Sequence, residues 1–278
     1  MIWLNIPSPS ISSVSLGPLT IHFYSLCILA GMFVAWQLGA RRAVARGGNR
    51  EDFDIIVLYT IVFGIIGARI YHVITHYQDY FGPGRDPLGV FKTWEGGIAI
   101  MGGLIGGALT ILFLTRRKGI NTAAFLDTLA PGVLFAQGIG RLGNWFNQEL
   151  FGLPTKLPWG LEIDAAHRPL GYTQYETFHP TFLYEMLWNF TGGFVLIWLE
   201  KKFKLGHGRV FALYLAWYML GRSFIEAIRI DPSNEIWGIR VNNLSAGITF
   251  VVAVAIFIWL SVKKPGQTEN PLKSSLID

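Results

Sequence analysis

The sequence predicts an all-α integral membrane protein, because apolar residues dominate its composition and gather in blocks of membrane-spanning length. Hydrophobic residues make up 51% of the 278-residue chain and charged residues only 15%, with a mean hydropathy of +0.40. An α-helix needs about 20 consecutive, mainly apolar residues to cross the hydrocarbon core of a bilayer. We therefore expect a helix bundle whose core lies within the membrane.

Seven apolar blocks are long enough to predict about seven transmembrane helices in one integral membrane domain over residues 1–278. They lie near residues 20–40, 53–74, 96–115, 122–140, 181–199, 208–228 and 244–262. The fourth block is the weakest, because Asp127, Pro131 and Gln137 interrupt it. A broken or partly re-entrant helix shielded by its neighbours is an alternative for that block.

Basic residues predict the orientation, since they favour the cytoplasmic side of short loops. They follow the first, third, fifth and seventh blocks, at Arg41–Arg50, Arg116–Lys118, Lys201–Arg209 and Lys263–Lys264. The N-terminus is then outside and the C-terminus cytoplasmic. Residues 142–180 form an outward-facing loop region, and the polar tail 265–278 is a cytoplasmic segment that we expect to be disordered.

Other features of the composition exclude several classes of function. The formal net charge of +5 falls in short clusters between apolar blocks, so it indicates topology and no nucleic-acid partner. Cys27 is the only cysteine, which excludes an internal disulfide and a cysteine metal cluster, and we expect no metal and no cofactor. Residues 1–20 lack the pattern of a cleaved signal peptide and are expected to be retained.

Ionisable residues inside the apolar blocks are the main indication of function, because charge at membrane depth is costly and usually marks a site. In the predicted topology Arg69, Arg141 and Arg222 all fall towards the outer ends of even-numbered spans, with His22 and Tyr24 at the same level. Guanidinium groups bind phosphate through paired hydrogen bonds. The sequence therefore predicts a site for an anion such as a phospholipid headgroup near the outer face.

The alternative is that these arginines only neutralise buried carboxylates. Arg222 and Glu226 have the i, i+4 spacing of one helix face, and Asp127 or Glu185 can pair with Arg69. Both interpretations stay open for Arg69 and Arg222, and the pairing interpretation is weaker for Arg141.

Arg141 lies in a stretch unusually rich in small and polar residues, 138–152. Glycines there allow a ligand to approach the backbone, Asn144 and Asn147 supply amides, and Glu149 supplies a carboxylate. His179 begins a second polar cluster on the same side, where an interfacial cap is the more ordinary role than a catalyst. This density of polar groups favours a substrate site.

These residues carry a family resemblance. Residues 140–152 read Gly-Arg-Leu-Gly-Asn-Trp-Phe-Asn-Gln-Glu-Leu-Phe-Gly, which resembles the signature of the bacterial phosphatidylglycerol:prolipoprotein diacylglyceryl transferases. The resemblance extends over residues 16–262. It includes Ile21-His22-Phe23-Tyr24, Gly67-Ala68-Arg69-Ile70, Trp94-Glu95-Gly96-Gly97, His179-Pro180, Leu183-Tyr184-Glu185, and Tyr218 with Arg222, Glu226 and Arg229.

The resemblance implies a multi-pass enzyme of the bacterial plasma (inner) membrane with its active site towards the outer leaflet. It implies transfer of the diacylglyceryl group of phosphatidylglycerol to the lipobox cysteine thiol of a prolipoprotein, with formation of a thioether and release of glycerol phosphate. The implied catalytic residues are Arg141, Arg222, Tyr24 and Glu149. Those implied to bind phosphatidylglycerol are Arg141, Asn144, Gly152, Tyr218, Arg69 and Asn147, and those implied to give structural or proton-transfer support are His22, His179 and Glu226.

The chain departs from the family pattern at one position of interest. Many members carry a histidine just before the glycine pair of the third span, and this chain has Met101 there. A methionine side chain cannot accept the thiol proton. The general base therefore stays open among Glu149, Tyr24, His22, His179 and the phosphate oxygens of the substrate.

Two other classes of function compete with the transferase. A transporter or channel for a lipid or an anion also places arginines at membrane depth, but the chain shows no inverted repeat and no matched pair of broken helices. An intramembrane hydrolase needs a serine nucleophile or paired aspartates, and here Asp127 stands alone and Gly-x-Ser-x-Gly is absent from the sequence.

Overall fold

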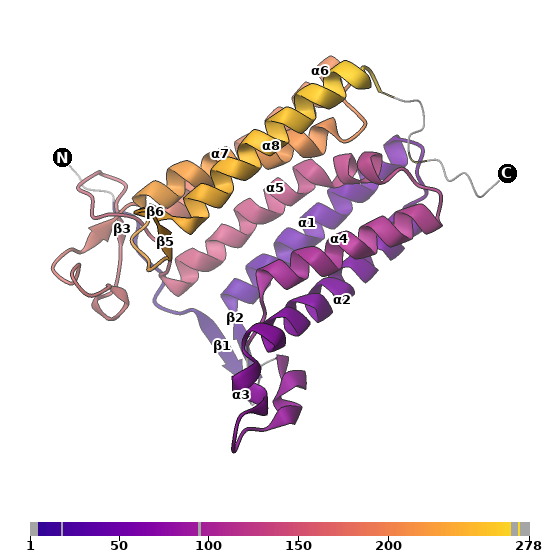
Figure 1. Ribbon diagram of the computed structural model, residues 1–278. Helices are drawn as coiled ribbons and strands as arrows, with labels where there is room; N and C mark the ends of the chain where they lie inside the picture. The colour runs from indigo at the N-terminus through magenta and orange to yellow at the C-terminus, as the bar shows by residue number, and fades with distance from the viewer. Residues whose placement is uncertain (1–4, 18, 94–95, 268–271, 273–278) are drawn as a thin grey trace. The chain divides into compact units, whose positions relative to one another are not determined.

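A computed structural model describes residues 5–17, 19–93, 96–267 and 272, and it is mostly helical (Figure 1). Six of the described helices are long and apolar enough to cross a membrane, which establishes an all-α, multi-pass membrane protein. They are α1 (Phe23–Ala45), α2 (Arg50–Thr75), α4 (Ile100–Arg117), α5 (Thr122–Asn147), α6 (Thr181–Phe203) and α8 (Val241–Lys263).

The sixth expected span forms helix α7 (Arg209–Ile228), which is not among those six helices. Its 20 residues include the charged residues Arg209, Arg222 and Glu226, which lower its apolar character. The count of seven spans and the placement of the two termini stay predictions. The expected tail falls largely on residues 268–271 and 273–278, outside the described residues, as do Trp94 and Glu95 of the family-like segments.

Helix α5 differs from its prediction in length and continuity. It runs without a break through Pro131 and ends at Asn147, so residues 142–147 of the expected loop are helical. Glycines on this stretch allow close packing, since an added Cβ at Gly143 would meet the ring of Tyr24 and one at Gly138 would meet the ring of Phe190. The interpretation as a broken helix was wrong because this packing favours a continuous one.

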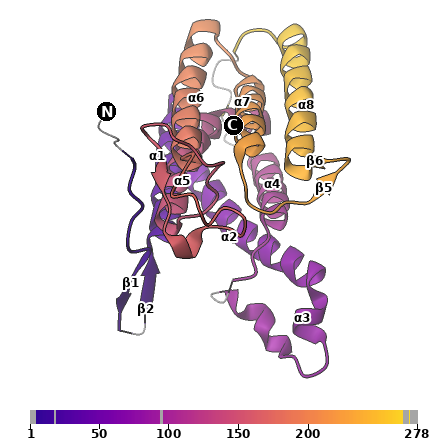
Figure 2. The same cartoon turned by 90° about the vertical axis from the view of Figure 1, so that its left-hand side faces the viewer.

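The described chain divides into two compact units, residues 1–39 with 126–268 and residues 40–125 with 269–278. In the first unit, residues of α5, α6 and α7 pack around a core that includes Leu134, Leu196 and Tyr214. The hairpin of β1 (Ser13–Leu16) and β2 (Leu19–His22) precedes α1 and extends from its start (Figure 2). That the two units act as one catalytic domain stays a prediction.

Asp127, an isolated acidic residue of α5, has a structural role in the first unit. Its carboxylate accepts hydrogen bonds from the backbone N–H groups of Gly208 and Phe211, each at 2.9 Å. The N-terminus of a helix carries unpaired N–H groups and a partial positive charge, and both favour a carboxylate. The fully buried Asp127 therefore caps α7 from a neighbouring helix.

The second unit contains the pair α2 and α4, which lie side by side in Figure 1 and contact each other along their length. The short helices α3 (Tyr77–Phe81) and η1 (Pro87–Phe91) follow α2. Arg69 of α2 donates hydrogen bonds to the carbonyl oxygens of Gly89, Val90, Gly96 and Gly97 at 2.6–2.9 Å. Arg69 is thus bound to backbone carbonyl oxygens in place of the carboxylate partner that the pairing interpretation named. Its guanidinium holds the segments around residues 89–90 and 96–97 close to α2.

The segment between α5 and α6 is folded and has a core of its own. The short strands β3 (Leu161–Glu162) and β4 (Thr177–Phe178) pair, the turn η3 (Ala165–His167) lies between them, and Phe151, Ile163 and Phe178 are buried. The N-terminal residues bind this segment: Ile6 exchanges backbone hydrogen bonds with Gly160 and Glu162. The part of the expected loop region after α5 is therefore a folded layer to which Ile6 is paired.

Candidate active site

Two of the three predicted arginines meet at one carboxylate. Arg141 near the end of α5 lies 2.5 Å from Glu185 in the first turns of α6, and Arg222 near the end of α7 lies 3.6 Å from the other oxygen of the same carboxylate. The arginine side chains are 17% and 18% exposed, and that of Glu185 is 7% exposed. The two guanidinium groups therefore converge from different helices and keep a partly accessible face.

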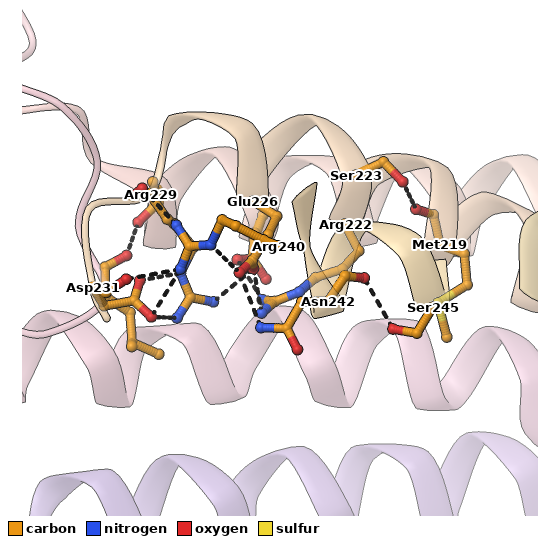
Figure 3. Close-up of polar contacts among 12 residues, drawn as sticks. Met219, Arg222, Ser223, Glu226, Arg229, Asp231, Arg240, Asn242 and Ser245 are labelled. Carbon is orange, nitrogen blue, oxygen red and sulfur yellow. Dashed lines mark hydrogen bonds and ion pairs between the residues drawn. The ribbon is translucent and has the colours of Figure 1, made fainter. Parts of the chain in front are cut away.

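Arg222 also joins a second, fully buried carboxylate, Glu226, one turn further along α7 (Figure 3). Their separation is 2.6 Å, so the i, i+4 pairing that the sequence left open as an alternative is present. Arg229 and Arg240 approach the same carboxylate at 3.5 and 3.0 Å, and the Asn242 amide donates a hydrogen bond to it at 2.9 Å. The Oε2 atom of Glu226 and the Nε atom of Arg240 lie within ion-pair distance of their partners, but neither atom is aligned for a hydrogen bond.

The cluster continues into the hairpin of β5 (Glu235–Ile236) and β6 (Ile239–Arg240), which joins α7 to α8. Arg229 binds Asp231 at 2.6 and 2.8 Å, and Arg240 donates hydrogen bonds to the carbonyl oxygens of Arg229 and Asp231. Burial raises the pKa of the Asp231 carboxyl, but the Arg229 hydrogen bond and charge outweigh this, and the pKa lies below its usual value. For Arg229 the two effects have the opposite sign: burial lowers its pKa, but the hydrogen bond and charge of Asp231 outweigh burial, and the pKa of Arg229 lies above its usual value.

Within the direct ion pairs the cluster holds more positive than negative groups. Four guanidinium groups face three carboxylates, and a further carboxylate, the exposed Glu149, reaches Arg141 only through the Asn144 amide. The members are Arg141, Arg222, Arg229 and Arg240, with Glu185, Glu226 and Asp231. Because an uncompensated charge away from water is costly, this arrangement favours the binding of an anion.

The signature residues surround Arg141 as the sequence suggested. The Asn144 side chain accepts a hydrogen bond from Arg141 at 3.3 Å and donates one to Glu149 at 2.7 Å, and Asn147 donates to the same Glu149 oxygen at 3.4 Å. Asn144 is buried and Glu149 is exposed. The amides thus connect the arginine to a carboxylate that faces outward.

The turn after α5 holds Glu149 in that position. Gln148 and Leu150 on either side of it have left-handed backbone angles, with φ of 50° and 58°. Such angles are uncommon for residues other than glycine and are often found at functional sites. The Gln148 amide stabilises the turn by hydrogen bonds to Asp164 in both directions, at 2.6 and 2.9 Å.

Gly152 and His179 contribute backbone contacts. Gly152 donates its N–H to the carbonyl of His179 at 3.0 Å, and an added Cβ would lie 2.9 Å from the His179 side chain and 3.0 Å from the Ile228 carbonyl. Only glycine fits this approach. The His179 ring lies 3.1 Å from the hydroxyl of Tyr184, and burial lowers the pKa of its imidazole.

Three of the remaining predicted site residues lie in the same unit as Arg141, at positions outside the arginine cluster. Tyr24 is 37% exposed, and its ring packs on Gly143, two residues beyond Arg141. His22 ends β2 opposite Ser13, and Tyr218 stacks on Tyr214 of α7 at 6.3 Å. Arg69 belongs to the other compact unit. Within the described ranges no group of three His, Cys, Asp or Glu side chains is placed to hold a metal ion.

Comparison with known proteins places this geometry in a family. Residues 12–259 match the family model described as prolipoprotein diacylglyceryl transferase. The chain belongs to this family. A phosphatidylglycerol--prolipoprotein diacylglyceryl transferase of Cutibacterium acnes is 55% identical over 92% of this chain and 87% of its own length. Similar proteins with that name are 47% identical in Streptomyces coelicolor (number 2 there; 94% and 82% covered) and 46% in Paenarthrobacter aurescens (98% and 88%).

In this member of the family, sequence reasoning missed part of the cluster. Asp231, Arg240 and Asn242 lie in the connection between the last two expected spans or at its end, where charged residues are ordinary. Arg229 stood out only through the family resemblance. Arginines outnumber carboxylates in the direct ion pairs only because the β5–β6 hairpin folds back and brings Arg240 to Glu226.

A reciprocal pair of tryptophans fixes α6 against α7 one turn from the cluster. Trp188 donates its indole N–H to the Trp217 carbonyl, and Trp217 donates to the Trp188 carbonyl, each at 3.0 Å. The rings stack with centroids 4.7 Å apart, and each covers a glycine of the opposite helix, Gly221 and Gly192 respectively. Since Glu185 lies three residues before Trp188, this clasp helps to set the Glu185–Arg222 distance.

We expect Trp188→Phe to lower the thermal stability of the detergent-solubilised protein, because it removes one indole hydrogen bond worth about 1 kcal/mol and some packing. The double variant with Trp217→Phe should lose less than the sum of the single losses, since the two rings share one contact. Trp198→Phe, on an exposed part of the same helix, is the control. Strict additivity of the two substitutions would mean that the rings act independently.

Proposed function

We propose that this chain transfers the diacylglyceryl group of phosphatidylglycerol to the lipobox cysteine thiol of a prolipoprotein, forming a thioether and releasing glycerol phosphate. The observation that carries the proposal is the convergence of Arg141 and Arg222 on Glu185. Because the Glu185 carboxylate already orients both guanidinium groups, they can bind a second anionic group, the phosphate of the lipid, without further rearrangement.

The chemistry follows from what the reaction needs. The cysteine sulfur, as thiolate, attacks the glycerol carbon that carries the phosphate ester. The carbon–oxygen bond breaks and its electron pair stays on the phosphate, so negative charge grows there. Arg141 and Arg222 stabilise that charge, and Glu185 keeps both guanidinium groups oriented before the lipid arrives.

The neighbouring residues shape the site. Asn144 orients Arg141 and links it to Glu149, which faces outward where the thiol can approach. Gly152 allows the chain to pass close to His179. Tyr24 and Tyr218 position the reacting groups, and Asn147 is a further lipid contact, whereas the guanidinium of Arg69 is occupied by backbone carbonyls of the other unit. His22, His179 and Glu226 give support. The position of Met101 carries no base, and we assign the proton to no single acceptor.

The topology proposed with this function places the site at the outer leaflet of the bacterial plasma membrane. The basic residues after α1, α4 and α6 support a cytoplasmic location for those helix ends. Arg141, Arg222 and the start of α6 then share the opposite side. Phosphatidylglycerol enters from the bilayer, and the prolipoprotein presents its lipobox from the same side.

The test is a transfer assay with the full-length protein in detergent. Phosphatidylglycerol and a lipobox peptide, without added metal, should give a peptide that gains one diacylglyceryl group by mass, attached at cysteine. A lipobox peptide with serine in place of cysteine is the control. Movement of lipid between leaflets of proteoliposomes with no modified peptide would instead support a transporter and reject the transferase.

A further inference from the structure

A row of glycines brings α2 and α4 together over one half of their length. An added Cβ at Gly67 would lie 2.5 Å from the Gly102 carbonyl oxygen, and one at Gly106 would lie 2.5 Å from the Phe63 carbonyl oxygen. Such small residues let membrane helices pack backbone against backbone. The row ends at Gly107, whose Cβ would meet Thr60 at an ordinary 3.4 Å.

Where the glycine row ends, large side chains begin and a groove opens between the two helices. It has a volume of about 620 Å³, within the range of roughly 300–1,000 Å³ typical of small-molecule sites. Its lining comes from the first half of α2 and the last half of α4. The residues are Tyr59, Phe63, Leu109, Thr110, Phe113, Leu114, Arg117 and Lys118.

Most of this lining is apolar and open to the surroundings. Tyr59 and Phe63 stack at 6.2 Å and are 47% and 45% exposed, and Leu109 and Phe113 opposite them are 62% and 59% exposed. On a helix pair of a membrane protein, exposed side chains of this kind contact acyl chains. The groove therefore fits a hydrocarbon chain lying along the helices.

One end of the groove is cationic. Lys118 is paired with Asp52 at 2.6 Å, which offsets its charge, so Arg117 supplies the net positive charge at the groove end. Arg117 is exposed, and within the described ranges it has no charged or hydrogen-bonding partner. An arginine at the end of a membrane helix reaches the headgroup level, and basic pockets between such helices bind anionic headgroups.

We propose that this groove is a binding site for an anionic phospholipid and that it shares no residue with the catalytic cluster. One acyl chain lies against Tyr59, Phe63 and Phe113, and the phosphate binds Arg117 beside Lys118. A zwitterionic lipid has the same phosphate, but its cationic group leaves the headgroup without the net negative charge that Arg117 attracts. The groove belongs to the compact unit that does not contain Arg141 and Arg222.

The test measures which lipid stays on the protein. Full-length protein is equilibrated in mixed micelles of phosphatidylserine and phosphatidylcholine, and the retained lipids are counted by native mass spectrometry. Phosphatidylserine serves as the probe because its headgroup differs from that of the proposed substrate. Arg117→Ala should lower the retained ratio of phosphatidylserine to phosphatidylcholine about fivefold, which corresponds to roughly 1 kcal/mol per basic residue.

Arg116→Ala is the matched control, because Arg116 is also exposed and adjacent in sequence but does not line the groove. It should leave the ratio nearly unchanged. Phe113→Ala removes part of the apolar wall and should lower retention of both lipids, while its exposed position protects the fold. Equal effects of Arg116→Ala and Arg117→Ala, or no effect of Arg117→Ala, would reject the site.

Discussion

Arg141→Lys is expected to lower kcat/KM for diacylglyceryl transfer by about 100-fold, the loss typical when one preorganised donor to a developing oxyanion is removed. Lysine keeps the positive charge and can still pair with Glu185. It loses the planar fork that contacts Glu185 and Asn144 together and leaves a face for the phosphate. The measurement is initial-rate transfer to a lipobox peptide over a range of phosphatidylglycerol concentrations.

Two comparisons make this result specific. Arg85→Lys, at an exposed position outside the cluster, should keep normal rates. The thermal stability of Arg141→Lys should stay close to that of the unmodified chain, because the charge balance with Glu185 is preserved. Normal turnover in Arg141→Lys would show that the arginine serves only to neutralise Glu185.

Glu226→Gln should have the largest effect on stability, with a loss of about 3–5 kcal/mol, as expected when one partner of a buried ion pair is removed. The Glu226 side chain is fully buried, and Arg222, Arg229 and Arg240 all lie within 3.6 Å of it. Glutamine keeps the shape but leaves these three guanidinium groups with less negative charge. The midpoint of thermal unfolding in detergent measures the loss.

Glu235→Gln is the control, because it removes an exposed carboxylate from the hairpin that follows α7. It should change the midpoint of thermal unfolding little. If Glu226→Gln unfolds at the same temperature as the unmodified chain, the buried network does not contribute to stability. Activity at a temperature where both proteins are folded then separates stability from catalysis.

The sequence was sufficient for most of the helices, because apolar blocks of membrane-spanning length can be recognised along the chain alone. Orientation placed Arg141 and Arg222 at one level, and the structure shows that they meet. The sequence alone could not predict the role of Glu185. The rotation of α6 directs this carboxylate towards both arginines, and that rotation depends on packing between helices. The Trp188–Trp217 clasp is part of that packing.

Local patterns failed where tertiary contacts decide the structure. Residues 142–147 belong to the expected loop region, yet they are helical, and the ring of Tyr24 packs on Gly143 there. Arg240 lies on a two-residue strand, too short to leave a periodic pattern. Its contact with Glu226 spans a turn that the sequence did not predict.

The N-terminal residues have a consequence for the order of folding. Ile6 pairs with residues near 160, Asn5 binds Glu162 157 positions away, and Trp145 donates to the Pro7 carbonyl across 138 positions. Residues 5–7 therefore find these partners only after α5 and the following segment have been synthesised. Contacts so distant along the chain form late and slowly. The layer around the Arg141 turn is completed only when residues 5–7 have reached it, so a substitution that weakens this pairing should delay maturation of the site.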